Sequence, residues 1–542
     1  MPFSSNHIAL KDTGRFSKLV LDYIQGQSPL KDMLPAYPEI EDIGKQLARK
    51  SQQNINRHLL HQVISEQCQS IELHPLQVNF LNSLTALNTF TICTAHQPNL
   101  FSGHLYLIYK IIHAIELADL CRLKFPAYQF VPVYYIGSED HDLEEIGSWN
   151  WNHQAFRWHT NQSGACGSMH LQDIEPFIQY LEKTTNIHVP EQEAMLRLVK
   201  KAYHPGHTVS QAIRIFINGL FSDKGLLILD ANHSAFKASF IPHLMAECFE
   251  QKSEKVLKTE FETWQKHYPV QAFLRPINLF YLRQGLRSRI VREGELWKVL
   301  DTDITFSEKQ LREEIQQFPE RFSPSVILRP LYQEFILPNI AFIGGGAEVA
   351  YWLPLKSYFE QSGILMPLVF LRNSFQLIEK QLYLKIQAMG LSWNELFEST
   401  NSRMNRLMDN QTEYQHFLEI KNKLIADSQL LLPIGATVSE PLRETTQAHI
   451  TQLKNILDAL ELKFKRHLKR KETLQAGQWQ KIQSSFFPDG HLQERHDNFL
   501  SWYQEWGDDL LNILHQSCQP FGTTFCMIAD NPQGFKYNQH IY

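Results

Sequence analysis

Two short, nearly continuous apolar runs flank an amphipathic stretch in the first third of the chain. The runs are Thr91–Ala95 and Phe130–Ile136, and the stretch between them, 104–124, carries apolar residues at a spacing of three and four. Runs of this kind are typical of parallel strands that are buried on both faces. The spacing of three and four is that of a helix that covers a sheet. We therefore predict a strand, a helix and a second strand as neighbouring elements of one sheet.

The same alternation continues along the chain. Apolar runs predict strands at 225–230, 326–328, 340–343, 366–370 and 524–529, and helical periodicity predicts helices at 208–222, 331–337 and 347–359. Alternating strands and helices are the pattern of a doubly wound, Rossmann-like parallel sheet. We therefore expect an α/β fold with two connecting insertions and a long α-helical coiled-coil domain.

Changes in composition along the chain indicate where the segments begin and end. The stretch from 149 to about 208 is richer in polar and aromatic residues, and 273–292 alternates around Arg283-Gln284-Gly285, which predicts a hairpin. We expect an N-terminal helical segment (1–90), a core (91–148, 223–270 and 323–375) with two insertions (149–222 and 271–322), the coiled coil (376–475) and a segment that returns to the core (476–542).

The last long helical stretch carries apolar residues that resemble a coiled-coil seam. They are Ile450, Leu453, Ile456, Leu457, Leu460, Phe464 and Leu468. A seam of this length needs a partner, which is the preceding helix, roughly 400–428, or a second subunit. A helical hairpin that also dimerises satisfies both interpretations.

The composition narrows the class of protein. Of the 542 residues, 43% are hydrophobic and 20% are charged, so we expect a folded protein of two or three domains. The net charge of −5 gives no reason to expect nucleic acid as a partner. The seven scattered cysteines form no CxxC pair, which favours a reducing compartment. Because the chain shows neither a signal-peptide layout nor an apolar run of about 20 residues, we expect it to be cytoplasmic, with no membrane partner.

The most informative polar turn, His96–His104, follows the first predicted strand and precedes a helix. The backbone N–H groups at such a helix start are unpaired, and the helix dipole favours anions. A phosphate bound at Gly103 would meet these amides, the imidazole of His104 and the amine of Lys110 from the same helix. The alternative is that Asn99 and Ser102 only cap the helix. We favour a functional turn, because two histidines add titratable donors that no cap requires.

A second polar turn, Ser138–Asp142, follows the next strand and holds three carboxylates and a histidine. Repulsion between the carboxylates calls for a cation, and an ammonium group of a substrate or a Mg²⁺ shared with phosphates would supply one. The alternative is a solvated acidic turn that caps the next helix. Zinc is a weaker candidate, because the turn offers one His and no Cys.

Three further stretches at strand ends are candidates for binding anions. Gly344-Gly345-Gly346 opens a helix after a strand, and its glycines allow a ligand to approach the backbone closely. It is not a GxGxxG motif, so a dinucleotide site is not indicated. Arg329 can bind a carboxylate through two hydrogen bonds, or can pair with a structural acid. Arg372-Asn373 ends the last predicted strand of the sheet.

The first turn also resembles the nucleotide-binding signature His-x-Gly-His of class I aminoacyl-tRNA synthetases and pantothenate synthetases. Gly103-His104 matches its last two positions, and Phe101 stands where the first histidine is expected.

The motifs as a set resemble one family, the cysteine-adding enzymes of bacillithiol biosynthesis, over nearly the full chain. The stretches that carry the resemblance are Thr94–Lys110, Ser138–Glu145, Phe322–Pro324, Leu328–Gln333, Gly344–Lys356, Phe487–Gly490 and Leu492–Arg495. Many members of the family have Gly-Gln-Gln in place of Ala95-His96-Gln97, and Pro in place of His104. The resemblance therefore implies no role for the two histidines.

The resemblance implies a class I synthetase-like Rossmann core, a dimer formed by the coiled coil, and a reaction that joins L-cysteine to glucosaminyl malate to give bacillithiol. Forming an amide from a free carboxylate in water is thermodynamically unfavourable, so we expect ATP as co-substrate. Mg²⁺ could bind together with the nucleotide. An acyl-adenylate or an acyl-phosphate of cysteine would then react with the amine.

We assign candidate roles on this basis. The catalytic candidates are His104, His141 and Asp140, and no residue is assigned to a resident metal. The candidates for binding substrate and nucleotide are His96, Gln97, Asn99, Ser102, Gly103, Tyr106, Lys110, Ser138, Glu139, Asp142, Arg329, Gln333, Gly344, Gly345, Gly346, Glu348, Tyr351, Arg372 and Asn373. A synthetase or nucleotidyl transferase that acts on another small acid is the first alternative, and a non-catalytic coiled-coil scaffold is the second.

Overall fold

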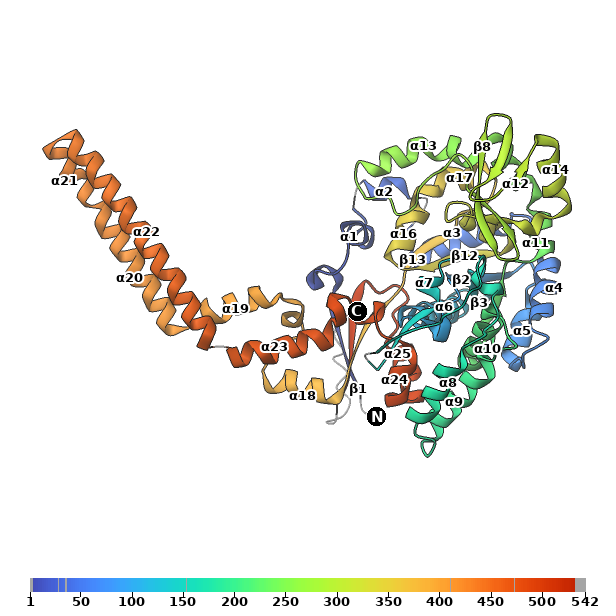
Figure 1. The fold of residues 1–542 in the computed structure, drawn as a ribbon, viewed down its shortest axis with the longest axis horizontal. Coiled ribbons are helices and arrows are strands. Elements are labelled where there is room, and N and C mark those ends of the chain that lie inside the picture. The colour runs from blue at the N-terminus through green and yellow to red at the C-terminus, as the bar shows by residue number, and fades with distance from the viewer. Residues whose placement is uncertain are drawn as a thin grey trace. The chain divides into compact units, whose positions relative to one another are not determined.

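The structure is a computed structural model, which describes residues 3–531 apart from 28, 35, 36, 153, 410 and 472. The chain forms two compact units, one of Met1–Leu377 with Leu492–Tyr542 and the other of Ile378–His491 (Figure 1). None of the described helices has the length and apolar composition of a membrane-spanning segment.

The first unit is built on a five-stranded parallel sheet in the order β13-β12-β2-β3-β6. Its strands are β2 (Thr89–His96), β3 (Gln129–Ile136), β6 (Leu227–Asp230), β12 (Asn339–Gly344) and β13 (Leu368–Leu371). Numbered one to five in chain order, these strands lie in the order 5-4-1-2-3. Taken from the other edge of the sheet this is 3-2-1-4-5, the Rossmann arrangement, in which the strand order reverses between β2 and β12. The expected doubly wound α/β sheet is confirmed, and its switch point is where such folds bind ligands.

Helices cover both faces of this sheet, because successive side chains of each strand point to opposite sides. Val133 and Tyr135 belong to one hydrophobic core, whereas Tyr134 and Ile136 belong to another. The helices of this unit are α1 (Lys18–Gln25), α2 (Leu30–Met33), α3 (Ile40–Lys50), α4 (Arg57–Gln67), α5 (Pro75–Ser83), α6 (Tyr106–Lys124), α7 (Leu143–Ile146), α8 (Glu175–Thr184), α9 (Pro190–Ala202), α10 (Val209–Phe221), α11 (Ser234–Ser239), α12 (Ile241–Met245), α13 (Lys252–Gln265), α14 (Glu308–Gln317), α15 (Arg329–Ile336), α16 (Gly346–Trp352), α17 (Lys356–Gln361), α24 (Phe499–Trp506) and α25 (Asp508–Ser517).

Two insertions and a third sheet complete the first unit. The first insertion holds the hairpin β4 (Ser148–Trp151) and β5 (Gln154–Arg157), and the second holds the antiparallel strands β7 (Leu279–Arg283), β8 (Leu286–Glu293), β9 (Leu296–Val299), β10 (Thr305–Phe306) and β11 (Phe322–Pro324). The third sheet has the order β1-β15-β14, with β1 (Phe3–Ala9), β14 (Ser374–Ile378) and β15 (Thr524–Asp530).

Three predicted elements differ from the structure. The predicted strand 326–328 is wrong, because these residues form the turn before α15; the strand is β11, which pairs with β7 of the second insertion. Ile327 and Leu328 are apolar because they are fully buried. The N-terminal segment is not only helical, since β1 pairs with β15. Residues 376–378, expected at the start of the helical domain, instead belong to β14 (Ser374–Ile378).

The described residues of the second unit form helices joined by turns, apart from Ile378, which ends β14. Its helices are α18 (Lys380–Ala388), α19 (Thr400–Asp409), α20 (Thr412–Gln429), α21 (Leu431–Val438), α22 (Glu440–Lys471) and α23 (Thr473–Phe486). The unit ends at His491 rather than near 475, because α23 packs against α18 and α19. Helices α20 and α22 form the coiled-coil hairpin (Figure 1).

The predicted seam divides between two surfaces of the hairpin. Ile450, Leu457 and Leu468 are buried, and Phe464 stacks on Phe417 of α20 at a ring distance of 5.0 Å. Ile456 and Leu460 are instead 60% and 47% exposed, and Leu462, which lies outside the predicted seam, is 59% exposed. The preceding helix is therefore one partner of the seam, and a second apolar surface stays open.

Candidate functional site

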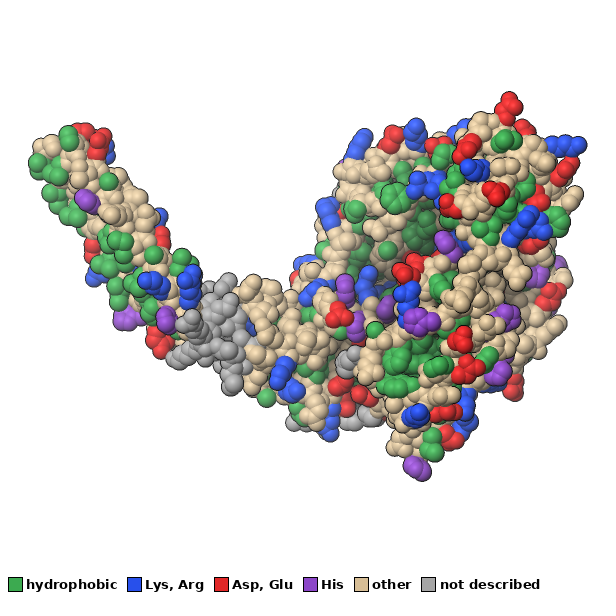
Figure 2. Space-filling view, viewed as in Figure 1, with side chains coloured by type: hydrophobic (Ala, Val, Ile, Leu, Met, Phe, Trp, Pro, Cys, Tyr) green, Lys and Arg blue, Asp and Glu red, His purple; other side chains and the backbone are tan. Residues whose placement is uncertain are grey.

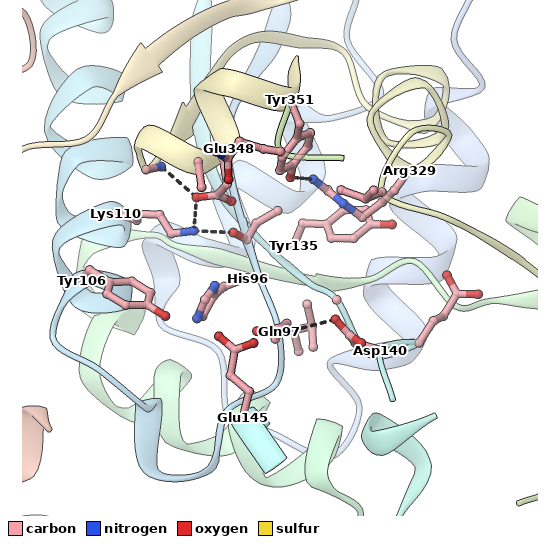
Figure 3. A pocket seen from close by; sticks show the side chains of 18 of the residues that line it. His96, Gln97, Tyr106, Lys110, Tyr135, Asp140, Glu145, Arg329, Glu348 and Tyr351 are labelled. Carbon is pink, nitrogen blue, oxygen red and sulfur yellow. Dashed lines mark hydrogen bonds and ion pairs between the residues drawn. The ribbon is translucent and has the colours of Figure 1, made fainter. Parts of the chain in front are cut away.

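A cleft of about 500 Å³ lies at the carboxyl ends of β2, β3 and β12, at the switch point of the sheet. Figure 2 shows charged and histidine side chains gathered around a hollow of the larger unit. The predicted candidates that line the cleft are His96, Gln97, Tyr106, Lys110, Glu139, Asp140, Arg329, Gly345, Gly346, Glu348, Tyr351 and Arg372. The three turns at 96–104, 138–142 and 344–348 therefore each contribute residues to one cleft (Figure 3).

The end of β2 carries His96 and Gln97 into the cleft. His96 Nε2 is buried and has no hydrogen-bond partner among the described residues. Burial, together with the nearby charge of Lys110, lowers the pKa of His96 well below 6.5, so its ring is neutral near pH 7. Its ring meets that of Tyr106 edge to face at 5.2 Å. Gln97 Nε2 donates to Asp140 Oδ2 at 2.8 Å, which joins the first turn to the second.

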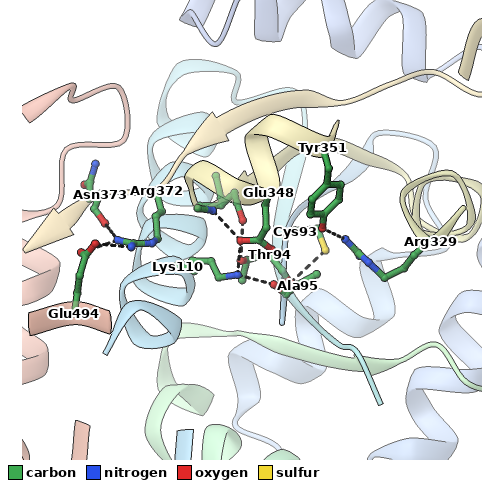
Figure 4. Close-up of polar contacts among 12 residues, drawn as sticks. Cys93, Thr94, Ala95, Lys110, Arg329, Glu348, Tyr351, Arg372, Asn373 and Glu494 are labelled. Carbon is green, nitrogen blue, oxygen red and sulfur yellow. Dashed lines mark hydrogen bonds and ion pairs between the residues drawn. The ribbon is translucent and has the colours of Figure 1, made fainter. Parts of the chain in front are cut away.

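Lys110, which is buried, and Glu348, which is half-buried, form an ion pair that joins α6 to the glycine turn (Figure 4). Lys110 Nζ donates to Glu348 Oε2 at 2.7 Å and to the Ala95 carbonyl at 2.8 Å. The same Glu348 oxygen accepts the Gly345 N–H at 2.8 Å and so caps α16. A Cβ on Gly346 would approach Val20 of α1 to 2.9 Å, so close packing accounts for this glycine. The glycine turn thus has a structural role in addition to its place at the cleft.

Arg329, at the start of α15, has two neutral partners. Its guanidinium donates to Gln333 Oε1 at 3.0 Å and to the Tyr351 hydroxyl at 2.7 Å. Among the described residues no carboxylate lies within ion-pair distance of it. The alternative of a structural acid as partner of Arg329 is therefore wrong for this part of the chain. Arg329 therefore brings a positive charge to the cleft lining.

The acidic turn is balanced by cations of the protein itself. Glu139 forms an ion pair with Lys237, whose side chain is fully buried. Asp142 accepts the Glu145 N–H and caps α7, as the alternative interpretation of this turn predicted. Asp140 Oδ1 accepts the N–H of His141. Because these carboxylates have partners within the chain, their repulsion alone does not require a ligand.

His141 lies beside the cleft and lines a neighbouring pocket of about 340 Å³. Arg287 Nη1 lies 2.7 Å from His141 Nδ1, and since a guanidinium only donates, this ring nitrogen accepts. Burial and the charge of Arg287 lower the pKa of His141. Arg287 itself lines both pockets and stacks over the Phe280 ring at 3.9 Å. Ser138, also outside the cleft, donates to Asp230.

The second half of the first turn lies outside the cleft lining. Asn99, Ser102, Gly103 and His104 are absent from it, and α6 begins only at Tyr106. Asn498 Nδ2 donates to the carbonyls of Phe101 and Gly103, at 2.8 and 2.6 Å. The Leu105 N–H donates to the Asp497 carbonyl. The C-terminal segment therefore takes the Leu105 N–H, a backbone donor at the helix start of the kind that the sequence assigned to a phosphate, and holds the turn in place.

Neither predicted role for the side chains of this turn fits the structure. His104 Nδ1 donates to the His496 carbonyl at 3.3 Å, and burial lowers the pKa of His104. The helix has no side-chain cap, because Asn99 Nδ2 donates to the Glu145 carbonyl instead. Ser102 is fully buried.

Arg372, at the end of β13, faces the cleft but is held by the C-terminal segment. It forms two hydrogen bonds with Glu494, at 2.8 and 2.6 Å, and both side chains are almost fully buried (Figure 4). Asn373, next in the chain, bonds the backbone of Gln519 rather than lining the cleft. Gln333 and Gly344 are buried behind the cleft wall.

Several residues of the cleft lining were not predicted. Those with polar side chains are Tyr135, Glu145, Gln271, Arg287, Ser325 and Arg495. Arg287 comes from the second insertion and Arg495 from the C-terminal segment, so no strand-end pattern marks them. The motif at 492–495 was noted as part of the family resemblance, which is the one signal that could have identified Arg495. In the part of the chain that the structure describes, no group of three or more His, Cys, Asp or Glu residues could hold a metal ion.

Two models of one protein family together match nearly the whole chain. A family model described as "Bacillithiol biosynthesis BshC, N-terminal Rossmann-like domain" matches residues 3–373. A second, "Bacillithiol biosynthesis BshC, C-terminal coiled-coil domain", matches residues 375–529. The two models thus cover the parallel sheet with its insertions and the helical unit.

Full-length relatives carry the name "Putative cysteine ligase BshC". That of Flavobacterium johnsoniae is 35% identical over 96% of this chain and 99% of its own, and that of Flavobacterium psychrophilum is 35% identical over 96% and 98%. That of Christiangramia forsetii is 34% identical over 97% and 99%. A solved structure of an arginyl-tRNA synthetase homologue from Campylobacter jejuni has a TM-score of only 0.20 at 10% identity over 78% of this chain and 98% of its own, too low to compare folds. The chain belongs to the BshC family of bacillithiol biosynthesis.

Proposed function

We propose that the protein is an ATP-dependent ligase that joins the carboxyl group of L-cysteine to the amine of glucosaminyl malate and so forms bacillithiol. The family and the printed name of its relatives support a cysteine ligase. The observation that carries the proposal is the charge of the cleft, whose lining includes guanidinium groups with no carboxylate at ion-pair distance among the described residues, because the proposed substrates are anionic.

Three guanidinium groups of the cleft have no carboxylate within ion-pair distance among the described residues, namely those of Arg287, Arg329 and Arg495. Guanidinium groups bind carboxylates and phosphates through paired hydrogen bonds. The malate part of the acceptor has two carboxylates, and ATP brings a triphosphate. An uncompensated set of arginines in one cleft is what such substrates need.

The amide must be made from an activated acid. In the proposed reaction a carboxylate oxygen of cysteine attacks a phosphorus atom of ATP, and pyrophosphate or ADP leaves with the electron pair of the broken P–O bond. The amine of glucosaminyl malate then attacks the acyl carbon and loses a proton, and AMP or phosphate leaves. The cationic side chains would stabilise the negative charge that develops on the phosphoryl and carbonyl oxygens.

The acidic side of the cleft would hold the ammonium groups. Asp140 and Glu145 line the cleft across from Lys110 (Figure 3). Burial raises the pKa of Glu145, which makes this carboxylate a better proton acceptor. We assign to these two residues the binding of the cysteine and sugar amines, with Glu145 in place of His141 as the candidate base.

The protein would act as a homodimer through the open surface of the coiled coil. Ile456, Leu460 and Leu462 of α22 are exposed, together with Ile420 and Leu424 of α20. Figure 2 shows hydrophobic side chains spread along this hairpin. An apolar stripe on a two-helix hairpin is buried by a second copy of the same surface in a symmetric dimer.

The test is synthesis of bacillithiol from purified components. The protein is incubated with ATP, Mg²⁺, L-cysteine and glucosaminyl malate, and the product is identified by mass. We expect a product that requires ATP and that Asp140→Asn reduces at least tenfold. Product formed without any nucleoside triphosphate would contradict the ATP-dependent step, and formation of an amide only with an acid other than cysteine would favour a different small-acid synthetase.

A further inference from the structure

The guanidinium group of Arg329 is supported from behind by a chain of buried polar side chains. Arg329 Nη1 donates to Gln333 Oε1 at 3.0 Å, and Gln333 Nε2 donates to Glu334 Oε1 at 2.9 Å. Gln333 and Glu334 are both 0% exposed. The chain therefore leads from the wall of the cleft into the interior of the protein.

The chemistry of these three groups allows one arrangement only. A guanidinium donates and never accepts, so Gln333 must turn its amide oxygen toward Arg329. The NH₂ of that amide then points into the interior, where a buried donor needs an acceptor. Glu334 supplies the acceptor. Without it, the orientation that Arg329 requires would leave the buried NH₂ of Gln333 without this acceptor.

Glu334 is itself held by residues of two other elements. Asn339, at the start of β12, donates to the same Oε1 at 2.9 Å, and Lys50 of α3 lies 3.6 Å from Oε2 with a fully buried side chain. Burial raises the pKa of Glu334 to about 7 against the opposing effect of Lys50. A buried ion pair is a weak source of stability, because desolvation of the two charges offsets their attraction. The pair therefore calls for another explanation.

From this geometry we infer that Glu334 is a positioning residue for the anion site. It orients the amide of Gln333, and the amide holds the guanidinium of Arg329 at the cleft wall, where it binds a carboxylate of a dicarboxylic acid substrate. The identity of this anion rests on the proposed function. The orientation of the three side chains does not.

A matched pair of double variants separates this role from the structural role of the ion pair. Lys50→Met with Glu334→Met removes both charges and the acceptor for Gln333. Lys50→Met with Glu334→Gln also removes both charges but keeps an amide oxygen that can accept from Gln333. The probe is L-malate, and its dissociation constant is measured by titration calorimetry with the full-length protein.

We expect the Met/Met variant to bind L-malate about tenfold more weakly than the wild type, and the Met/Gln variant to bind within about twofold of it. Gln333→Met, which leaves the ion pair in place, gives the same loss if a double variant fails to fold. In an Arg329→Met background the Met/Met changes cause no further loss, because the group that they position is gone.

Equal binding of L-malate by the two double variants would overturn the inference, as would an additional loss in the Arg329→Met background. Wild-type protein that binds no L-malate would overturn it too. A wild type that binds L-malate in the expected pattern but makes no bacillithiol would contradict the proposed function alone.

Discussion

Some charged side chains of the cleft form ion pairs within the protein, and others do not. Lys110 has Glu348, and Arg372 has Glu494. Arg287 has only hydrogen bonds to His141 and Ser323 among the described residues. Residues that the fold leaves unsatisfied in a cleft are the ones that substrate must satisfy. Arg287 is therefore where a substitution should affect binding without unfolding the protein.

Replacing Arg287 by Met should raise the KM for glucosaminyl malate about tenfold or more, because a hydrogen bond to a charged group contributes roughly 1.5–3 kcal/mol. The melting temperature should change little, since Met can keep the apolar packing over Phe280. Arg292→Met is the control, because Arg292 lies on the same strand, does not line the cleft, and contacts the Gly294 carbonyl and the Trp297 ring. Steady-state kinetics on both variants measures the difference. Equal KM values for the two would exclude Arg287 from the substrate site.

What the sequence predicts about single residues depends on whether a local pattern marks them. His96, Gln97, Glu139 and Asp140 follow buried strands, and all four line the cleft. Lys237 could not be predicted as the partner of Glu139, because nothing near it in the sequence indicates that it lies beside the acidic turn. Arg287 could not be predicted as a cleft residue for the same reason, because no strand-end pattern lies near it in the sequence. Strand-end patterns identify the edge of the sheet, but not the residues that distant segments bring to it.

His113 should make the protein less stable in mild acid. It is fully buried; Nε2 donates to the Pro520 carbonyl and Nδ1 accepts the Asn373 N–H, which only the neutral ring can do. Burial lowers the pKa of His113 to about 4, against an unfolded value of 6.5. Between these values the unfolded chain binds the extra proton, so stability falls as the pH drops through this window.

The contribution is on the order of 3 kcal/mol at full extent, from 1.36 kcal/mol per pKa unit. Urea unfolding at several pH values between 7 and 4 measures it, and His113→Gln should show a shallower fall than the wild type. The exposed His159→Gln serves as control. A parallel pH dependence of wild type and His113→Gln would contradict the assignment of this loss to His113.

At the scale of elements, the spacing of apolar residues predicts a strand or helix where that spacing follows from the burial of the segment itself. The strands β2, β3, β6, β12 and β13 are apolar runs because both of their faces are covered, and all five were found from the sequence. The strand β1 was missed, because its sequence mixes polar and apolar residues and its pairing partner lies about 520 residues away, with His7 opposite Cys526. Its identity as a strand depends on that partner rather than on its own pattern.

The exposed stripe of the coiled coil should hold two copies together. Ile456→Glu with Leu460→Glu adds charges to the stripe and should convert a dimer into a monomer, as measured by light scattering after gel filtration. Helix content by circular dichroism should stay the same, because both side chains are exposed and the hairpin contacts of Leu457 and Phe464 are kept. Gln452→Glu with Asn455→Glu adds the same charge to polar exposed positions of α22. A dimer that survives the first pair of changes would place the interface elsewhere.

At the scale of the whole molecule, the C-terminal segment completes the unit that the first 377 residues begin. Its strand β15 pairs with β1, Asn498 binds the turn before α6, and Glu494 binds Arg372 at the end of β13. The site therefore depends on a segment that follows the helical unit in the chain. This explains why the turn before α6, read alone, indicated an open phosphate site.

The Arg372–Glu494 pair should be the contact on which this closure depends most. Both side chains are nearly fully buried, so Glu494→Gln leaves a guanidinium charge without a counter-charge in the interior and should cost roughly 3–5 kcal/mol. Arg372→Met with Glu494→Met removes both charges and should recover much of that loss, since apolar side chains of similar volume often replace a buried pair without penalty. The midpoint of urea unfolding compares the variants. A Glu494→Gln midpoint equal to that of the wild type would mean that the segment is held by its strand and by Asn498, and that the pair serves the cleft rather than the fold.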